Sequence, residues 1–248
     1  MKILQAMAGG EWGGAENFFV RLAIAISGAG VDQSVVIRQH KRRAKRLAEA
    51  GVDTVELPFG GVFDWRTRTN LKKQIKYFKP NIVLSWMNRA TKFCSTSIDS
   101  KCIHIARLGG YYDLKYYQNC NYLIGNTENI VNYVTSEGWP AEKVEYLPNF
   151  VSVNGNKALE RDTYFTPKSA PLILALGRFH ENKGFDILLK ALSNVPGAYL
   201  WLAGDGPLRV QLEALAEKLG VKPRVRFVGW HEDVSPLLRA ADIFVCPS

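Results

Sequence analysis

Two cations and two glycines lie close together in one stretch of the sequence, residues 174–184, which reads LALGRFHENKG. Apolar residues 172–176 indicate a strand buried on both faces, and residues 185–192, rich in Leu and Ile, indicate a helix. Arg178 and Lys183 fall on the turn between them. This turn suits a phosphate or diphosphate, because the helix dipole and unpaired N–H groups favour negative charge and the guanidinium adds a forked donor. A surface loop with two solvated cations is the alternative.

The length and composition indicate a two-domain protein without a membrane-spanning segment. The 248 residues exceed one typical domain of about 150, and 47% of them are hydrophobic, enough for two cores. No run of roughly 18 uncharged apolar residues occurs, and residues 1–16 lack the long apolar region of a signal peptide. The four cysteines form no C-x-x-C pair. These features predict a cytoplasmic protein with reduced thiols and neither a zinc site nor a disulfide framework.

The net charge of +9 is concentrated in residues 1–150, which carry +7 of it, mostly in the runs 38–46 and 66–79. A nucleic-acid-binding protein would use such a face, but the usual recognition motifs are absent and the flanking patterns are those of helices packed on a core. Attraction to an anionic membrane surface fits as well, at about 1 kcal/mol per cation close to the lipid. A solvated face is the third interpretation. We expect no nucleic-acid partner.

In residues 1–150, apolar runs alternate with amphipathic stretches, which indicates parallel βαβ units. The expected strands are residues 2–7, 33–37, 54–57, 81–86, 102–106, 122–125 and 144–147. The expected helices are residues 15–26, 41–50, 66–78 and 127–137. Ligands of such folds bind at the carboxyl ends of the strands, so the loops 9–16, 107–112 and 126–127 are the informative ones.

The alternation restarts after a polar stretch without periodicity, residues 151–171, which we interpret as a linker. The expected strands are residues 172–176, 199–203, 225–228 and 243–245, with helices at 185–192, 209–219 and 234–240. The predicted architecture is two Rossmann-like doubly wound α/β domains, residues 1–150 and 172–248. The second is expected to be incomplete, because its last strand lacks the helix that would cover it.

Six short motifs in order give the sequence a recognisable signature. They are GGAE at 13–16, LPN at 147–149, LALGRFHENKG at 174–184, LAGDGP at 202–207, VRFVGW at 225–230 and AADIFVCPS at 240–248. In these motifs the chain resembles the family 4 glycosyltransferases of the GT-B fold, the glycosyltransferase group 1 type. The resemblance implies a nucleotide-sugar donor bound by the second domain and an acceptor bound mainly by the first.

The resemblance also assigns residues to the donor. Arg178 and Lys183 match the catalytic pair that neutralises the donor diphosphate, whose growing charge needs preorganised cations worth roughly 3 kcal/mol each in the transition state. The other donor-binding residues implied are Gly13, Gly14, Gly177, Gly204, Asp205, Gly206, Phe227 and Val228. Alternatively, the glycines serve only to form tight turns. No carboxylate cluster has metal-ligand spacing, so we expect a metal-independent enzyme with no cofactor.

The acceptor side departs from the family pattern. Many members carry a histidine just after the fifth strand, where this chain has Arg107, which we expect to contact substrate as a catalytic residue. His104 lies inside the strand and is expected to be a core histidine. Glu16, Tyr111 and Asp113 are the acceptor-binding candidates, with loop packing as the alternative for the last two.

A second departure lies at the end of the chain. The two glutamates of the family, which hold the donor sugar and the ribose, would begin a few positions beyond Ser248, and so would the helix that crosses back to the first domain. We therefore expect a C-terminally truncated chain with doubtful activity and apolar surface exposed.

The predicted function is retaining transfer of a hexosyl unit to a glycan or lipid-linked acceptor in cell-envelope or polysaccharide biosynthesis. The enzyme is expected in the cytoplasm, at the inner face of the membrane. One alternative is a non-catalytic protein that binds a nucleotide or an anionic glycan. Another is nucleic-acid binding through the basic half, which predicts a steep salt dependence.

Overall fold

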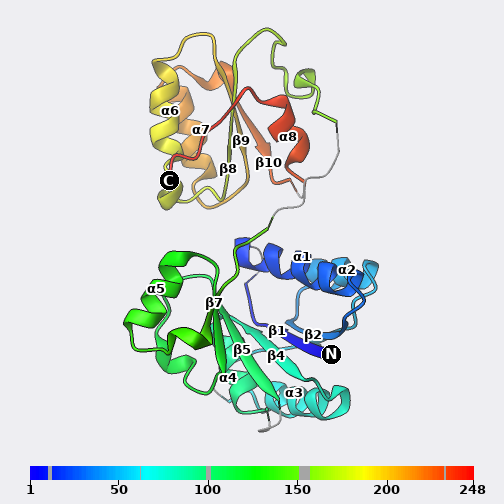
Figure 1. Cartoon of the computed structure of the whole chain (residues 1–248). Coiled ribbons are helices and arrows are strands. Elements are labelled where there is room, and N and C mark those ends of the chain that lie inside the picture. Colours follow the sequence, from blue (N-terminus) through cyan, green and yellow to red (C-terminus); the bar gives the residue numbers. More distant parts are fainter. Residues whose placement is uncertain (11–12, 62, 99–101, 151–156, 232) are drawn as a thin grey trace. The chain divides into compact units, whose positions relative to one another are not determined.

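The computed structural model describes residues 1–10, 13–61, 63–98, 102–150, 157–231 and 233–248. The chain divides into two compact units, Met1–Val151 and Ser152–Ser248, each built on its own parallel sheet (Figure 1). The predicted α/β fold with two parallel sheets is therefore confirmed. Residues 151–156 of the predicted linker lie outside the described residues.

The first unit has a seven-stranded parallel sheet in the order β3-β2-β1-β4-β5-β6-β7. Its strands are β1 (Lys2–Met7), β2 (Asp32–Arg38), β3 (Thr54–Leu57), β4 (Ile82–Trp86), β5 (Ile103–Leu108), β6 (Tyr122–Gly125) and β7 (Val144–Tyr146). The strand order reverses between β1 and β4. Loops that follow these two strands therefore diverge at the carboxyl edge, which is where doubly wound folds bind ligands.

Helices cover both faces of this sheet. They are α1 (Gly14–Gly28), α2 (Lys41–Glu49), α3 (Trp65–Phe78), α4 (Met87–Ser95) and α5 (Glu128–Ser136), with the short 3-10 turns η1 (Leu114–Tyr116) and η2 (Ala141–Lys143). The apolar sides of α1 and α2 share one core cluster, and those of α3 and α4 share another across the sheet (Figure 1). The side chains of Asp64 and Thr127 cap α3 and α5 by accepting backbone N–H bonds.

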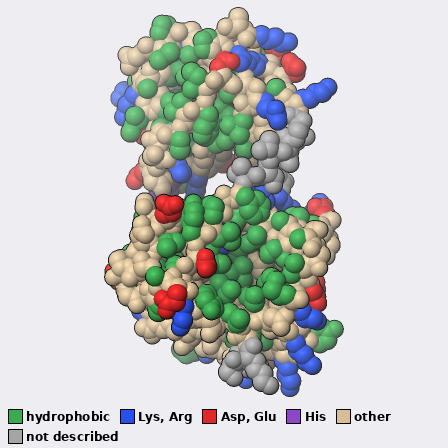
Figure 2. Space-filling view, viewed as in Figure 1, with side chains coloured by type: hydrophobic (Ala, Val, Ile, Leu, Met, Phe, Trp, Pro, Cys, Tyr) green, Lys and Arg blue, Asp and Glu red, His purple; other side chains and the backbone are tan. Residues whose placement is uncertain are grey.

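One part of the first sheet keeps apolar side chains in solvent. Ile103 and Tyr122 are 42% and 39% exposed, and the pairing of Ile105 with Tyr122 places them on one face of β5 and β6. Figure 2 shows hydrophobic side chains gathered on the visible face of this unit.

The second unit has a four-stranded parallel sheet in the order β10-β9-β8-β11. Its strands are β8 (Leu172–Leu176), β9 (Tyr199–Ala203), β10 (Val225–Gly229) and β11 (Ile243–Phe244). Its helices are α6 (Phe185–Ser193), α7 (Arg209–Lys218) and α8 (Ser235–Ala240), with 3-10 turns η3 (Arg161–Tyr164), η4 (Glu181–Lys183) and η5 (Lys222–Arg224). The core residues of α6 and α7 form one cluster, and α8 belongs to a second cluster with Trp201.

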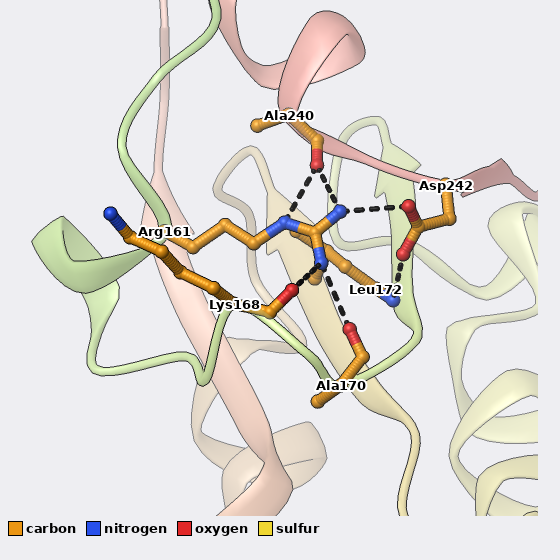
Figure 3. Close-up of polar contacts among 6 residues, drawn as sticks. All are labelled: Arg161, Lys168, Ala170, Leu172, Ala240 and Asp242. Atoms are coloured by element: carbon orange, nitrogen blue, oxygen red, sulfur yellow. Dashed lines mark hydrogen bonds and ion pairs between the residues drawn. The ribbon is translucent and has the colours of Figure 1, made fainter.

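The part of the predicted linker that the structure describes, residues 157–171, packs on the second unit. Arg161 donates from Nε and Nη2 to the Ala240 carbonyl at 3.0 and 2.8 Å, and from Nη2 to Asp242 Oδ1 at 2.8 Å (Figure 3). Asp242 Oδ2 in turn accepts from the Leu172 backbone at 2.8 Å. One guanidinium therefore joins this segment to α8 and to the start of β8. Hydrogen bonds therefore hold the described part of the predicted linker to these elements.

Candidate active site

The loop between β8 and α6 carries the strongest candidate residues and is held by backbone contacts. Phe179 is fully buried; its N–H donates to the Asp205 carbonyl at 3.0 Å, and its carbonyl accepts from Leu208 at 3.1 Å. Gly184 has a φ of 60°, in the left-handed region that favours glycine. The buried ring thus anchors a loop on which Arg178, the preceding residue, stays exposed.

Gly204 and Gly206, predicted to line the donor site, permit two loops to touch. A Cβ at Gly204 would lie 1.9 Å from the Gly177 carbonyl oxygen, and one at Gly206 would lie 2.6 Å from the Phe179 carbonyl oxygen. Gly177 also donates its N–H to Ala203 at 2.9 Å. These glycines have a packing role that fixes the shape of the carboxyl edge. Their contact with a donor stays a prediction.

Arg178 and Lys183 offer two positive charges on this edge. Within the described part of the chain, neither side chain has an ion pair or a hydrogen bond. Lys183 is half-buried, and its Cδ lies 3.6 Å from where a Gly177 Cβ would stand, so its stem packs along the loop. The loop leads directly into the N-terminus of α6. Two cations beside a helix N-terminus form a place suited to a diphosphate.

The other donor candidates of the second unit are engaged within the fold. Phe227 meets Phe179 edge to face at 5.9 Å and packs against the core. The Val228 carbonyl lies 3.2 Å from His231 Nε2. Asp205 accepts its neighbour's N–H through Oδ1 at 2.8 Å. The predicted contacts of Phe227, Val228 and Asp205 with the nucleotide remain predictions.

In the first unit, the glycine loop between β1 and α1 is filled by Glu16. This carboxylate is 5% exposed and accepts from the Gly10 N–H at 2.9 Å. A Cβ at Gly13 would lie 2.5 Å from Glu16 Oε2, whereas a Cβ at Gly14 would meet nothing within 4 Å. Of these two glycines, Gly14 is the one with open space around it. The proposed acceptor role of Glu16 and the donor roles of Gly13 and Gly14 stay predictions.

Arg43 is the buried partner of this loop and was not anticipated. It belongs to a basic run that suggested a solvated face, yet it is fully buried and donates from Nη2 to the Gly10 carbonyl at 2.7 Å. Burial lowers the pKa of Arg43, and the charge of Glu16 opposes that shift. Nothing in the run KRRAKR distinguishes this arginine, because its burial depends on the loop from β1.

Arg107, predicted to contact substrate, lies inside β5 and is 3% exposed. Its Nη2 donates to the Leu147 carbonyl at 3.2 Å and to Asn149 Oδ1 at 2.7 Å, and its guanidinium lies 4.6 Å from the Phe18 ring centroid and 4.9 Å from that of Trp86. Burial lowers its pKa to about 10. These contacts tie β5 to the segment after β7. A contact with substrate stays a prediction.

The two acceptor candidates in the loop after β5 contact different neighbours. Tyr111 is 65% exposed and packs edge to face on Tyr133 at 5.3 Å. Asp113 caps η1 and pairs with Lys115 at 2.5 Å, and hydrogen bonds from Lys115 lower the pKa of Asp113. Tyr112 lies in the same loop. Burial raises the pKa of Tyr112, and the negative charge of Glu16 raises it further.

His104 is a core residue, 2% exposed, with Nε2 2.8 Å from Ser85 Oγ. Burial lowers its pKa to about 4. Among the described residues, no group of three or more His, Cys, Asp or Glu could hold a metal ion. No helix in the same described residues has the length and apolar character needed to cross a membrane.

A pocket of about 280 Å³ in the first unit was not predicted from the sequence. It is lined by Gly60, Gly61, Arg68, Asn88, Arg89, Lys92, Phe93 and Tyr116. These residues follow the carboxyl ends of β3, β4 and β5. Arg89 and Lys92 belong to α4, a helix that the sequence did not predict.

Comparisons with known proteins agree with this architecture. The family described as Glycosyl transferases group 1 matches residues 170–248. Lipopolysaccharide core biosynthesis glycosyltransferase LpsE of Rhizobium meliloti (strain 1021) is 35% identical over 251 residues, covering 96% of this chain and 70% of that protein. LpsD of the same organism is 35% identical over 255 residues, covering 100% and 72%.

Solved structures with the same fold include glycosyltransferases. Anabaena Alr3699/HepE in complex with UDP and glucose is similar with a TM-score of 0.79 at 18% identity, over 98% of this chain and 73% of that chain. The lipopolysaccharide outer core galactosyltransferase WaaB, in its apo form, has a TM-score of 0.69 at 17% identity, over 98% and 73%.

Proposed function

Because the chain belongs to the group 1 glycosyltransferases, we propose that it transfers a hexosyl unit from a nucleotide sugar to a saccharide of the lipopolysaccharide core. The observation that carries the proposal is the position of Arg178 and Lys183, two cations without an ion pair among the described residues, at the N-terminus of α6. A uridine diphosphate donor agrees with the ligands of the structurally similar HepE.

In the proposed reaction, the bond between C1 of the sugar and the diphosphate oxygen breaks while an acceptor hydroxyl oxygen bonds to C1. The acceptor proton passes to the leaving diphosphate, and the positive charges of Arg178 and Lys183 stabilise the charge that develops there. No metal or cofactor is required in this scheme, since the two cations and the helix N-terminus neutralise the leaving group. The C1 configuration is proposed to be retained.

The proposed location is the cytoplasmic face of the membrane, with the first unit in contact with anionic lipid. The solvent side of α3 supports this: Trp65 and Tyr77 are 70% and 85% exposed among the exposed cations Lys72, Lys73 and Lys76. Aromatic rings favour the lipid interface, and each cation near it contributes about 1 kcal/mol. Co-sedimentation with phosphatidylglycerol vesicles, but not with neutral ones, would support this contact; equal recovery with both would contradict it.

The test of the reaction uses radiolabelled UDP-hexoses and a truncated lipopolysaccharide core as acceptor. The proposal predicts label in the acceptor, with a product whose anomeric proton coupling matches that of the donor by NMR. An inverted product would overturn the retaining step. Tight UDP binding without transfer or hydrolysis would instead support a non-catalytic binding protein.

A further inference from the structure

The pocket of the first unit combines positive charge with aromatic walls. Arg68, Arg89 and Lys92 line it, and none of the described Asp or Glu residues does. All three cations are exposed, and none has an ion pair among the residues that the structure describes. The nearby carboxylate of Asp64 accepts from the Gly60 N–H at 2.7 Å and the Thr67 N–H at 2.9 Å, so it serves the α3 cap. The pocket therefore attracts anions.

Local contacts hold two of these cations in place. Arg89 donates from Nη1 to the Phe59 carbonyl at 3.1 Å, which leaves its other N–H groups for a ligand. The Arg68 guanidinium lies 6.0 Å from the Phe93 ring centroid. A preorganised guanidinium loses less freedom when it binds an anion, so these contacts favour recognition of a phosphate or carboxylate.

The remaining walls suit a sugar ring. Tyr116, at 36% exposure, presents part of its ring, and Asn88 presents an amide whose Oδ1 accepts from Tyr117. No hydrogen bond from Asn88 Nδ2 occurs among the described residues, so this nitrogen can donate to a ligand. The backbone of Gly60 and Gly61 forms a wall without side chains. At about 280 Å³, the pocket is at the small end of ligand sites, which fits a single monosaccharide unit.

We infer that this pocket binds an anionic unit of the acceptor saccharide, through a phosphate or carboxylate held by Arg68, Arg89 and Lys92. The inference rests on the proposed function, since it makes the pocket the acceptor side of the same enzyme. It assigns acceptor recognition to residues of α3, α4 and η1, in addition to Glu16, Tyr111 and Asp113. Phosphorylated and acidic sugars share the chemistry that the pocket recognises.

The test is calorimetric binding of glucose 6-phosphate, glucuronate, glucose and inorganic phosphate to the full chain, with UDP titrated into the same samples. We expect glucose 6-phosphate or glucuronate to bind more tightly than glucose and inorganic phosphate. The double variant Arg68→Gln/Lys92→Gln should weaken that binding at least about tenfold, because charge-assisted hydrogen bonds are lost. The matched control Lys41→Gln/Lys143→Gln removes the same charge elsewhere on the first unit and should change it less than twofold.

The outcomes separate the pocket from the proposed function. Equal weakening in both double variants, or no binding of either anionic sugar while UDP binds, would overturn the pocket and leave the donor proposal intact. If glucose binds as tightly as the anionic sugars, the pocket does not select an anionic group. If inorganic phosphate binds as tightly, the pocket does not recognise the saccharide. If the unmodified chain does not bind UDP, this result would instead contradict the proposed function.

Discussion

The two units each place a glycine loop between a strand and a helix, but the loops differ in what occupies them. The loop from β1 to α1 is filled by its own carboxylate, since Glu16 is 5% exposed and accepts from Gly10. In the loop from β8 to α6, a buried phenylalanine anchors the chain, and Arg178 and Lys183 have no ion pair among the described residues. The carboxylate of the first loop is bound within its own loop. The cations of the second loop can bind an anionic ligand.

This difference shows that glycine spacing alone does not define an anion site. Glycine allows another group to approach the backbone closely, but neighbouring residues determine which group occupies that space. In the first unit that side chain is Glu16, with buried Arg43 beyond it. In the second unit the glycines meet backbone, because Gly204 packs on Gly177. The second loop is thus the better candidate for a diphosphate.

The largest effect is expected from one methyl group added at Gly204, which packs against the loop from β8 to α6, compared with one added at Gly14, at the start of α1. Gly204→Ala places Cβ 1.9 Å from a backbone oxygen at a φ of 139°, so the free energy of unfolding of the second unit should fall by more than about 4 kcal/mol. In Gly14→Ala the new methyl group meets open space in α1, so the free energy of unfolding of the first unit should change by no more than about 1 kcal/mol. Urea unfolding of each variant measures both values. Similar losses would contradict the difference in packing.

The next effect concerns Arg178 and Lys183. Arg178→Gln or Lys183→Gln should lower the turnover rate about a hundredfold, because one preorganised donor to the leaving group contributes roughly 3 kcal/mol in the transition state. Lys218→Gln removes an exposed charge near the end of α7 and should leave the rate unchanged. Release of UDP in a coupled assay gives the rates. A decrease of less than threefold in both site variants would argue against their role.

A smaller effect tests whether Glu16 fills the first loop. Gly13→Ala should cost about 2 kcal/mol of unfolding free energy, because the new methyl would lie 2.5 Å from Glu16 Oε2. In a Glu16→Ala background the same change should cost little, giving a coupling energy of about 1 to 2 kcal/mol. Denaturation of the four proteins of this cycle gives the number. Additive costs would mean that Glu16 leaves the loop in solution.

The smallest expected effect is the change in stability for each pH unit that is due to His104, the buried histidine of the first unit. The unfolded chain binds a proton at His104 near pH 6.5, whereas the folded chain binds it only near pH 4. Between these values the unfolded state holds more protons, so the free energy of unfolding falls as the pH is lowered from about 6.5 to about 4, by at most about 1.4 kcal/mol per pH unit. Unfolding of His104→Gln at pH 7, 6, 5 and 4 should show a shallower decline than the unmodified chain. Parallel curves would contradict a neutral buried histidine.

Most strands were predictable from the sequence because parallel strands buried on both faces are continuous apolar runs. The run 172–176 corresponds to β8 residue for residue, and 2–7 corresponds to β1. Helix α4 was missed because its buried side consists of Ala90, Thr91, Phe93 and Cys94, a mixture of small and polar residues without the usual leucine pattern.

Side-chain partners were less predictable, since they depend on which elements meet in space. Arg107 was placed in a loop, yet β5 continues through Leu108 and buries it under Phe18. Arg161 was assigned to a linker, but carbonyl groups of α8 and of its own segment satisfy its donors. Local composition carries no information about such contacts between distant residues. Arg178 and Lys183 could be proposed from the sequence because their motif is contiguous, and their role at the donor stays a prediction.

The measurement that tests the central claim most directly is the affinity for UDP of variants in the two loops. Calorimetric titration should show at least tenfold weaker binding for Arg178→Gln/Lys183→Gln and a change of less than twofold for Glu16→Gln and Lys218→Gln, each folded by circular dichroism. UDP affinity retained in Arg178→Gln/Lys183→Gln would contradict the claim that the loop from β8 to α6 holds the donor diphosphate.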